Sequence, residues 1–551
     1  MALPNDTMNK QQTQKRILIA TVLSFAFFIA YDFLYLQPKQ AMVNEANAKN
    51  AVALEKKNSV NTTEPSTQAA PVIQSQSGAN NAPISVLTEN NIIATITTQN
   101  NVIEIDNLGR IHQVTLSGNQ YIDDDAKHIK LFEANQLKPL EVRFSNREIN
   151  EEAFKTNVTA SQEKIDATTN STELILTQRL TDTTLTKVLK FYPDGHYDIT
   201  ASATNNAKFF ITTGFRPNVL VDMYADHGAL LALNDGTLNI IEDGDMDKNE
   251  ELIGINAASA FDRYYATALY NYDISMAISI MKDANDSPQI FIHANDKISL
   301  HGYMGPKEYR TLSALDPRLT TIIEYGWFTF IAKPMFILLQ YIHDYVGNWG
   351  WTIVFVTILI KLILFPLSHK GMVSMNRLKE LAPKVKAIQE KYKSDKQKAS
   401  MHMMELYKKE GANPMGGCLP IILQIPVFFA IYRVLLNSIE LKGAEWMLWI
   451  DDLGAMDPYF VLPILMGATM YFQQKITPNT MADPMQQKMF QLLPVVFTFF
   501  FLWFPAGLTL YWFVNNLFTI GQQYYVNRIF KNARIERHEK HVEEKTHNKK
   551  D

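Results

Sequence analysis

Lys361 lies inside an otherwise apolar stretch of the chain, WTIVFVTILIKLILFPL at 351–367. At about 1.5 Å per residue it is roughly 9 Å from the end of that stretch, where a charge in a bilayer costs about 2.5–3.5 kcal/mol. A lysine stem can lift its ammonium to the nearer interface, so snorkelling is one interpretation. The other is a functional cationic site within the membrane, which attracts anionic groups or carbonyl oxygens.

The elements that must position Lys361 are long apolar segments. They fall at 17–36, 349–368, 419–438, 458–473, 490–504 and 508–524. This pattern predicts a multi-pass α-helical membrane protein with six spans. Residues 504–507, FPAG, predict a tight hairpin between the last two spans. Residues 325–348 mix aromatic with charged side chains and predict an amphipathic helix lying in the interface.

Charge signs predict how these spans are oriented. The stretch 369–417 holds eleven Lys and Arg against five Asp and Glu, whereas 439–457 holds one Lys against five acidic residues. Because positively charged loops stay in the cytoplasm, 369–417 and the loop 474–489 are expected inside and 439–457 in the periplasm. The N-terminal residues 1–16 and the basic tail 525–551 are then also cytoplasmic.

The N-terminal region allows two interpretations. Basic residues in 1–16 precede the apolar segment 17–36, as in a cleaved signal peptide or an uncleaved signal anchor. The apolar run continues past Asp32 as FLYL without a prompt A-x-A site, which favours the anchor. Residues 37–83 are rich in Asn, Gln, Ser, Thr, Ala and Pro and predict a flexible linker.

Residues 84–324 alternate between apolar and polar positions in many short runs and predict a large periplasmic β-sandwich without intervening helices. The sequence around Pro193-Asp194-Gly195 predicts a β-hairpin. Its histidines are scattered and form no metal-ligand spacing, and the single cysteine, Cys418, excludes an internal disulfide. A folded spacer, a docking surface, and a sugar-binding or enzymatic role all stay open.

The cytoplasmic stretch 369–417 carries its own helical pattern. Apolar residues recur at three- and four-residue spacing from Met372 to Tyr392, surrounded by lysines. Ser394 and Asp395 are both candidate N-caps for a second helix that Gly411 can end. The result is a basic helical hairpin, which either only satisfies the charge rule or contacts ribosomal RNA, acidic lipid or an arriving chain.

The second half of the chain, from Tyr325 to Arg528, resembles the YidC-type membrane protein insertases. The resemblance rests on GNWGW at 347–351, NPMGGCLPIILQIPVFFAIY at 413–432, DPYFVLPILMGATMYFQQK at 457–475, DPMQQK at 483–488 and PVVFTFFFLWFPAGLTLYWFVNN at 494–516. The β-rich body is similar to the periplasmic domain of Gram-negative members. The resemblance places Lys361 at the family's intramembrane positive charge, where arginine is usual.

The same resemblance implies a hydrophilic substrate groove. Its residues are Lys361, Thr357, Gln424, Pro426, Phe428, Val495, Phe500, Tyr511 and Trp512. Trp512 stands where tyrosine is common and cannot accept a hydrogen bond. Each of these residues also has a plainer role: Gln424 as interhelical glue, Pro426 as a helix kink, and the aromatic residues as packing or interfacial anchors.

The resemblance implies an insertase of the bacterial inner membrane that is not an enzyme. The expected partners are nascent membrane proteins, the Sec translocon, the lipid bilayer, and the ribosome through the basic hairpin and tail. No cofactor, metal or small-molecule substrate is expected. A small-solute transporter or channel is the alternative, but inverted repeats are not evident. An intramembrane protease would need a Ser/His or paired-Asp arrangement, which the spans lack.

Overall fold

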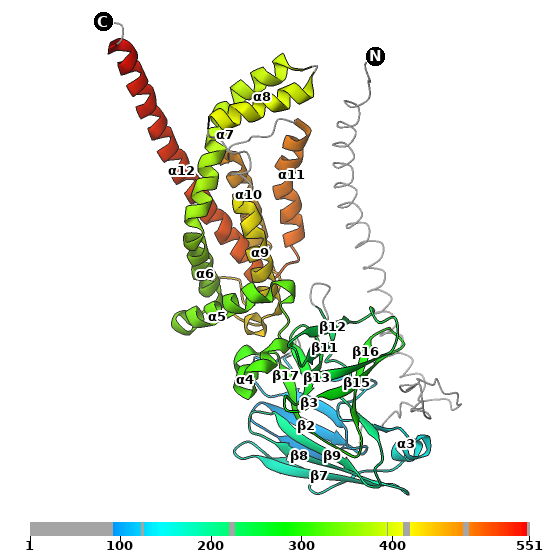
Figure 1. Ribbon diagram of the computed structural model, residues 1–551. Coiled ribbons are helices and arrows are strands. Elements are labelled where there is room, and N and C mark those ends of the chain that lie inside the picture. The colour runs from blue at the N-terminus through cyan, green and yellow to red at the C-terminus, as the bar shows by residue number, and fades with distance from the viewer. Residues whose placement is uncertain are drawn as a thin grey trace, which may run out of the picture. The chain divides into compact units, whose positions relative to one another are not determined.

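The computed structural model describes residues 92–547 apart from 119, 123–125, 220–225, 394, 411–418 and 478–483 (Figure 1). The predictions for 1–16, 17–36 and 37–83 therefore lie outside the described residues. Two compact units are distinguished. Leu381–Gly411 belongs to the first, and the rest of the described chain to the second.

The first part of the described chain is built of strands. They are β1 (Ile92–Thr97), β2 (Asn101–Asp106), β3 (Ile111–Leu116), β4 (Val142–Phe144), β5 (Thr159–Ala160), β6 (Lys164–Asp166), β7 (Thr172–Arg179), β8 (Thr184–Phe191), β9 (Tyr197–Ala203), β10 (Phe209–Thr212), β11 (Gly228–Leu233), β12 (Leu238–Glu242), β13 (Glu250–Phe261), β14 (Tyr265–Tyr270), β15 (Met276–Lys282), β16 (Pro288–Ala294) and β17 (Lys297–Pro306). The predicted β-rich body is thus confirmed.

These strands form two sheets. The smaller sheet has the order β3-β2-β1-β6, with β6 parallel to β1. The larger has 13 strands in the order β4-β10-β16-β15-β13-β14-β17-β9-β8-β7-β5, and β11 and β12 branch from β13. The long β13 makes this branching possible, because β15 pairs with its first half, and β14 and β11 with its second.

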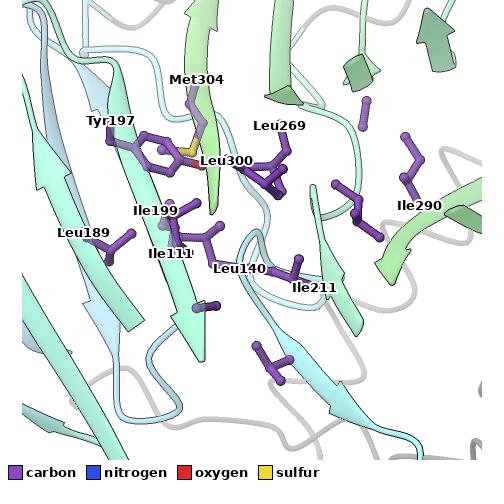
Figure 2. Packing of buried hydrophobic residues seen from close by; sticks show 14 of the residues in the cluster. Ile111, Leu140, Leu189, Tyr197, Ile199, Ile211, Leu269, Ile290, Leu300 and Met304 are labelled. Carbon is purple, nitrogen blue, oxygen red and sulfur yellow. The ribbon is translucent and has the colours of Figure 1, made fainter. Parts of the chain in front are cut away.

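The two sheets share one hydrophobic core. Ile111 of the smaller sheet belongs to the same buried cluster as Leu189, Tyr197 and Ile199 of the larger, and Figure 2 shows these side chains close together. Strand β8 shows the expected alternation, since every second residue from Leu185 to Phe191 is buried. Packing of two sheet faces on one core is the arrangement of a β-sandwich.

The hairpin predicted at Pro193-Asp194-Gly195 is confirmed. Strands β8 and β9 pair antiparallel from Phe191 opposite Tyr197, and Gly195 takes a φ of 92° in the turn. A short helix, α3 (Arg147–Ala153), interrupts the body where none was predicted. Asn146 explains it, because its side chain accepts hydrogen bonds from the first free backbone N–H groups of the helix.

The second half of the chain is helical. Its elements are α4 (Tyr309–Leu315), α5 (Thr329–Val346), α6 (Trp349–Ile363), α7 (Phe365–Lys391), α8 (Lys396–Lys409), α9 (Leu419–Asn437), α10 (Val461–Ile476), α11 (Pro484–Phe501) and α12 (Ala506–His547), with short 3₁₀ turns at Pro317–Ile322, Gly326–Phe328 and Ile439–Leu441. None of the described helices alone is long and apolar enough to cross a bilayer, but the bent pair of α6 and α7 passes that test together. The count of six spans stays a prediction.

Two boundaries differ from those predicted. The segment 349–368 is divided between α6 and α7, which meet at Leu364 with a bend of 64°. Pro366 accounts for the break, since its ring removes a backbone donor and clashes with the carbonyl of Leu362. The last helix does not stop near 524 but continues to His547, because the tail is rich in Arg, Lys and Glu, which favour helix.

Helices α7 and α8 are joined within the smaller unit. Lys384 on α7 pairs with Glu410 beyond α8 at 2.7 Å, and the Gln389 amide donates to the sulfur of Met403 at 3.7 Å. Asp395 caps α8 by accepting from the N–H of Lys398, as its position in the sequence predicted.

Polar contacts attach the β-rich body to the helical half around the end of α9. The Arg433 guanidinium pairs with Asp226 at 2.6 Å and with Glu324 at 3.6 Å. One helical turn later, Asn437 donates to the backbone carbonyl of Glu324, and Arg263 donates to that of Leu436. We call Asp226, Arg263, Glu324, Arg433 and Asn437 the junction cluster.

A second set of contacts joins α4, α5 and the turn after α9. Glu440 accepts from the N–H of Tyr309 at 3.2 Å and from the Gln340 amide at 3.5 Å, and Gln340 in turn accepts from Arg310. Loss of hydration raises the pKa of the Glu440 carboxyl to about 7. The folded state therefore retains this proton over a pH range in which the unfolded chain has lost it.

This retained proton makes stability pH-dependent. Between about pH 4.5 and about pH 7 the unfolded state binds fewer protons at Glu440, so the unfolding free energy falls as pH rises, by at most about 1.4 kcal/mol per pH unit. Glu440→Gln keeps the acceptor oxygen but does not titrate, so we expect its unfolding free energy to fall less as pH rises. Thermal unfolding of the full chain in lipid nanodiscs at several pH values measures it.

The variant Glu173→Gln is the control, because Glu173 is exposed on β7 and takes no part in the contacts around Glu440. It should leave the slope of stability against pH as in the original chain. An identical slope for Glu440→Gln and the original chain would contradict a retained proton at Glu440.

Candidate functional site

A small cavity lies among α6, α9 and α12. Its walls combine polar and apolar side chains from these helices and from the start of α7. They are Thr357, Ile360, Lys361, Leu364, Leu367, Ser368, Gln424, Val427, Tyr511 and Asn515. Four of the predicted groove residues, Lys361, Thr357, Gln424 and Tyr511, are thus brought to one place from three helices.

Lys361 is in the last turn of α6, just before the break at Leu364, and is only 7% exposed. Its ammonium donates to the hydroxyl of Thr519 on α12 at 3.0 Å. Within the described chain no carboxylate forms an ion pair with it. An ammonium has three donors, so the bond to Thr519 leaves two of them for another group.

Neutral amides hold the other side of the cavity. The Gln424 amide on α9 donates to the side-chain oxygen of Asn515 on α12 at 2.8 Å. Asn515 is 8% exposed, so this bond satisfies an acceptor that is shielded from water. The contact fixes α9 against α12 at the level of the cavity.

Thr357 and Tyr511 are the other two predicted groove residues in the cavity wall. Thr357 is 2% exposed and donates its hydroxyl to the carbonyl of Ile353 at 2.6 Å. This leaves the oxygen lone pairs of Thr357 as acceptors toward the cavity. Tyr511 is 3% exposed and places its ring in the cavity wall.

Phe428 and Trp512 lie together in an aromatic cluster instead of in the cavity wall. Their rings meet edge to face at 4.6 Å, and Trp512 also contacts Phe497 and Phe501 of α11 at 5.9 and 5.5 Å. Within the part of the chain that the structure describes, the indole N–H of Trp512 is buried without a hydrogen-bond partner. The cluster joins α9, α11 and α12 beside the cavity.

Three predicted groove residues are outside the cavity wall. Pro426 lies within α9 and removes the backbone donor that the carbonyl of Ile422 would use. Val495 on α11 is 64% exposed. Phe500 follows on the same helix and packs against Phe499 at 6.2 Å.

Sequence reasoning missed Asn515, Thr519 and Ser368. A signal for two of them was present, because Tyr511, Asn515 and Thr519 recur every four residues and so share one face of a helix. Ser368 is brought to the cavity by the bend between α6 and α7, which the apolar run alone did not predict.

Known proteins and family models match this chain along almost its whole length. A family model described as the 60Kd inner membrane protein matches residues 341–533, and a model of the YidC periplasmic domain matches residues 93–338. The chain is 50% identical to the membrane protein insertase YidC of Campylobacter jejuni over 94% of its length and 96% of that protein. The protein of the same name from Wolinella succinogenes is 46% identical over 95% of this chain and 96% of its own length. That from Helicobacter pylori is 43% identical over 96% of this chain and 98% of its own length.

The Gln424–Asn515 bond should stabilise the packing of α9 on α12. We expect a double-mutant cycle with Gln424→Leu and Asn515→Leu to give a coupling free energy of about 0.6 to 1.7 kcal/mol. Reversible unfolding of the purified protein in mixed micelles of lipid and detergent measures it.

Asn516 provides the control for that cycle. Its side chain is directed to Met466 and Thr469 of α10 instead, so Gln424→Leu with Asn516→Leu should show no coupling. Equal coupling in both cycles would mean that the effect is general loosening of α12 and not loss of the amide bond.

Proposed function

The chain belongs to the YidC family of membrane protein insertases, and we propose that the cavity around Lys361 receives the hydrophilic segment of a client protein as it crosses the bacterial inner membrane. The observation that carries the proposal is a buried lysine with no carboxylate partner in the described structure, set among polar side chains of three helices. A charge left unneutralised in this way has binding capacity for a group from outside the chain.

The physical task of an insertase is to lower the cost of taking polar groups through hydrocarbon. A peptide group without a hydrogen-bond partner costs several kcal/mol there. The Gln424 and Asn515 amides, the Thr357 hydroxyl and the Lys361 ammonium offer partners along the path. A hydrated cavity of this kind shortens the dry part of the route. The work is binding and transfer, so this is an insertase family and not an enzyme family.

Lys361 would attract carboxylates or backbone carbonyls of the client's translocated tail. The client's apolar helix would slide along the aromatic cluster at Phe428 and Trp512 and along α11 near Val495 and Phe500, then pass into lipid. Val495 is 64% and Phe499 56% exposed on α11, so this helix offers an apolar surface to a client helix or to lipid.

We further propose the six-span topology with both termini in the cytoplasm, and the β-rich domain in the periplasm. The opposite charge signs of 369–417 and 439–457 support this orientation. The basic hairpin and tail would face the ribosome, and the Sec translocon would be a partner for larger clients. Nascent membrane proteins and the bilayer itself complete the set of partners.

The positive charge of Lys361 should decide which clients are inserted. Lys361→Arg should stay active, whereas Lys361→Ala or Lys361→Glu should slow clients with acidic translocated tails and affect neutral tails less. The Coulomb energy at stake is about 4 kcal/mol for one pair at 4 Å in a medium of effective dielectric near 20, before desolvation is subtracted. Insertion of matched acidic and neutral clients into proteoliposomes measures it.

Lys333→Ala serves as the matched control for charge, because Lys333 lies on α5 and donates to Thr320, outside the cavity. It should leave the ratio of acidic to neutral insertion unchanged. Insertion of every acidic-tailed client at the original rate by Lys361→Ala would support snorkelling as the only role of the lysine.

The proposed orientation can be measured by cysteine labelling in a Cys418-free background. Gln120→Cys and Leu448→Cys should react with an impermeant thiol reagent added to the periplasmic side, since both positions are exposed and would lie in the periplasm under the proposed topology. Asp395→Cys and Lys540→Cys should react only after the cells are opened. Labelling at position 395 in intact spheroplasts would reverse the topology.

A further inference from the structure

The hydrogen-bond partner of Lys361 already uses its own hydroxyl proton within α12. The hydroxyl of Thr519 accepts from the ammonium at 3.0 Å and donates its own proton to the backbone carbonyl of Asn515 at 2.7 Å. A hydroxyl has only one proton. Because the backbone of α12 takes this proton, Thr519 presents only lone pairs to the Lys361 ammonium, so it can hold a cation and has no proton for an anion.

The same turn of α12 is attached to a third helix. Asn515, whose carbonyl orients Thr519, accepts with its side chain from Gln424 on α9. The lysine on α6 is therefore anchored to a turn of α12 that is itself tied to α9. The ammonium is held at a fixed place relative to all three helices that line the cavity.

A lysine needs such an anchor more than an arginine does. Its charge is a compact ammonium on a flexible stem, whereas guanidinium has five donors in a rigid fork. The end of the apolar stretch is only about six residues beyond Lys361, or roughly 9 Å, so an unanchored stem can turn toward the headgroups. The charge would then be lost from the cavity without any change in its sign.

We infer that Thr519 is a positioning residue, which holds the Lys361 ammonium inside the cavity and thereby makes it a defined binding point for acidic segments of clients. The inference rests on the proposed function and adds a residue to it. Thr519 itself offers no hydrogen-bond donor to an acidic client segment, because its one proton is used within α12. Its effect passes through Lys361 alone.

The test uses three substitutions in the full chain, reconstituted in proteoliposomes. Thr519→Val keeps the shape and removes the acceptor, and Thr519→Ser keeps the hydroxyl. Both are also made together with Lys361→Ala. The clients are one small membrane protein with an acidic translocated tail and its Asp-to-Asn counterpart with a neutral tail.

We expect Thr519→Val to slow the acidic client by about tenfold, the size of one hydrogen bond to a charged group, and to leave the neutral client near its original rate. Thr519→Ser should behave like the original chain. In the Lys361→Ala background, Thr519→Val should add nothing. With Lys361→Arg, whose fork finds other acceptors, the effect of Thr519→Val should be smaller.

Three results separate the possible failures. Equal slowing of both clients, or further slowing on top of Lys361→Ala, would show that Thr519 serves only packing. Normal insertion by Thr519→Val while Lys361→Ala is impaired would overturn the anchor and leave the charge role standing. Normal insertion of the acidic client by Lys361→Ala would overturn the charge role itself. If Thr519→Val does not assemble, Thr519→Ala gives the same comparison.

Discussion

A positive charge kept inside a helix bundle without an acidic partner is the constraint on which the rest of the helical half depends. Pairing Lys361 with a carboxylate would lower the cost of burial but would also neutralise the charge. The described structure uses neutral groups instead, with the Thr519 hydroxyl as direct acceptor. Neutral acceptors reduce the cost only in part, and under the proposed function the remaining unfavourable energy would favour binding of an anion. The break at Leu364 also shapes the surroundings of the charge, because it ends α6 just after Lys361.

The β-rich body influences the position of the cavity residues through its contacts with α9. Gln424, at the cavity, and Arg433, in the junction cluster, are nine residues apart on that helix, about 13.5 Å along its axis. Two acidic side chains, Asp226 and Glu324, surround the Arg433 guanidinium, and burial raises the pKa of Glu324. Separating a partly buried ion pair is costly, because it leaves each charge uncompensated. The β-rich body therefore fixes one end of α9, and with it the position of Gln424 along the helix axis.

Much of the architecture was accessible from sequence, because it depends on local patterns. Alternation predicted the strands, Pro193-Asp194-Gly195 predicted the β8–β9 hairpin, and a charge in an apolar run marked Lys361. What was missed depends on contacts between distant residues. Lys361 and Thr519 are 158 positions apart, and the sequence around neither residue predicts their contact. The resemblance supplied Thr357, Gln424 and Tyr511, but it grouped them with Val495 and Phe500, which the structure places outside the cavity wall.

The separation of the cavity from the aromatic cluster also explains how binding can be reversible. Between an apolar client helix and apolar protein surface in lipid there is no hydrophobic driving force, because lipid chains are equally apolar. In the proposed mechanism, the exposed side chains of α11, such as Val495 and Phe499, would therefore guide a client helix without retaining it. Retention would depend on the polar contacts in the cavity, and these would end when the client's tail reaches water on the far side and regains full hydration. The direction of transfer then follows from hydration of the tail and burial of the client helix in lipid, with no need for a covalent step.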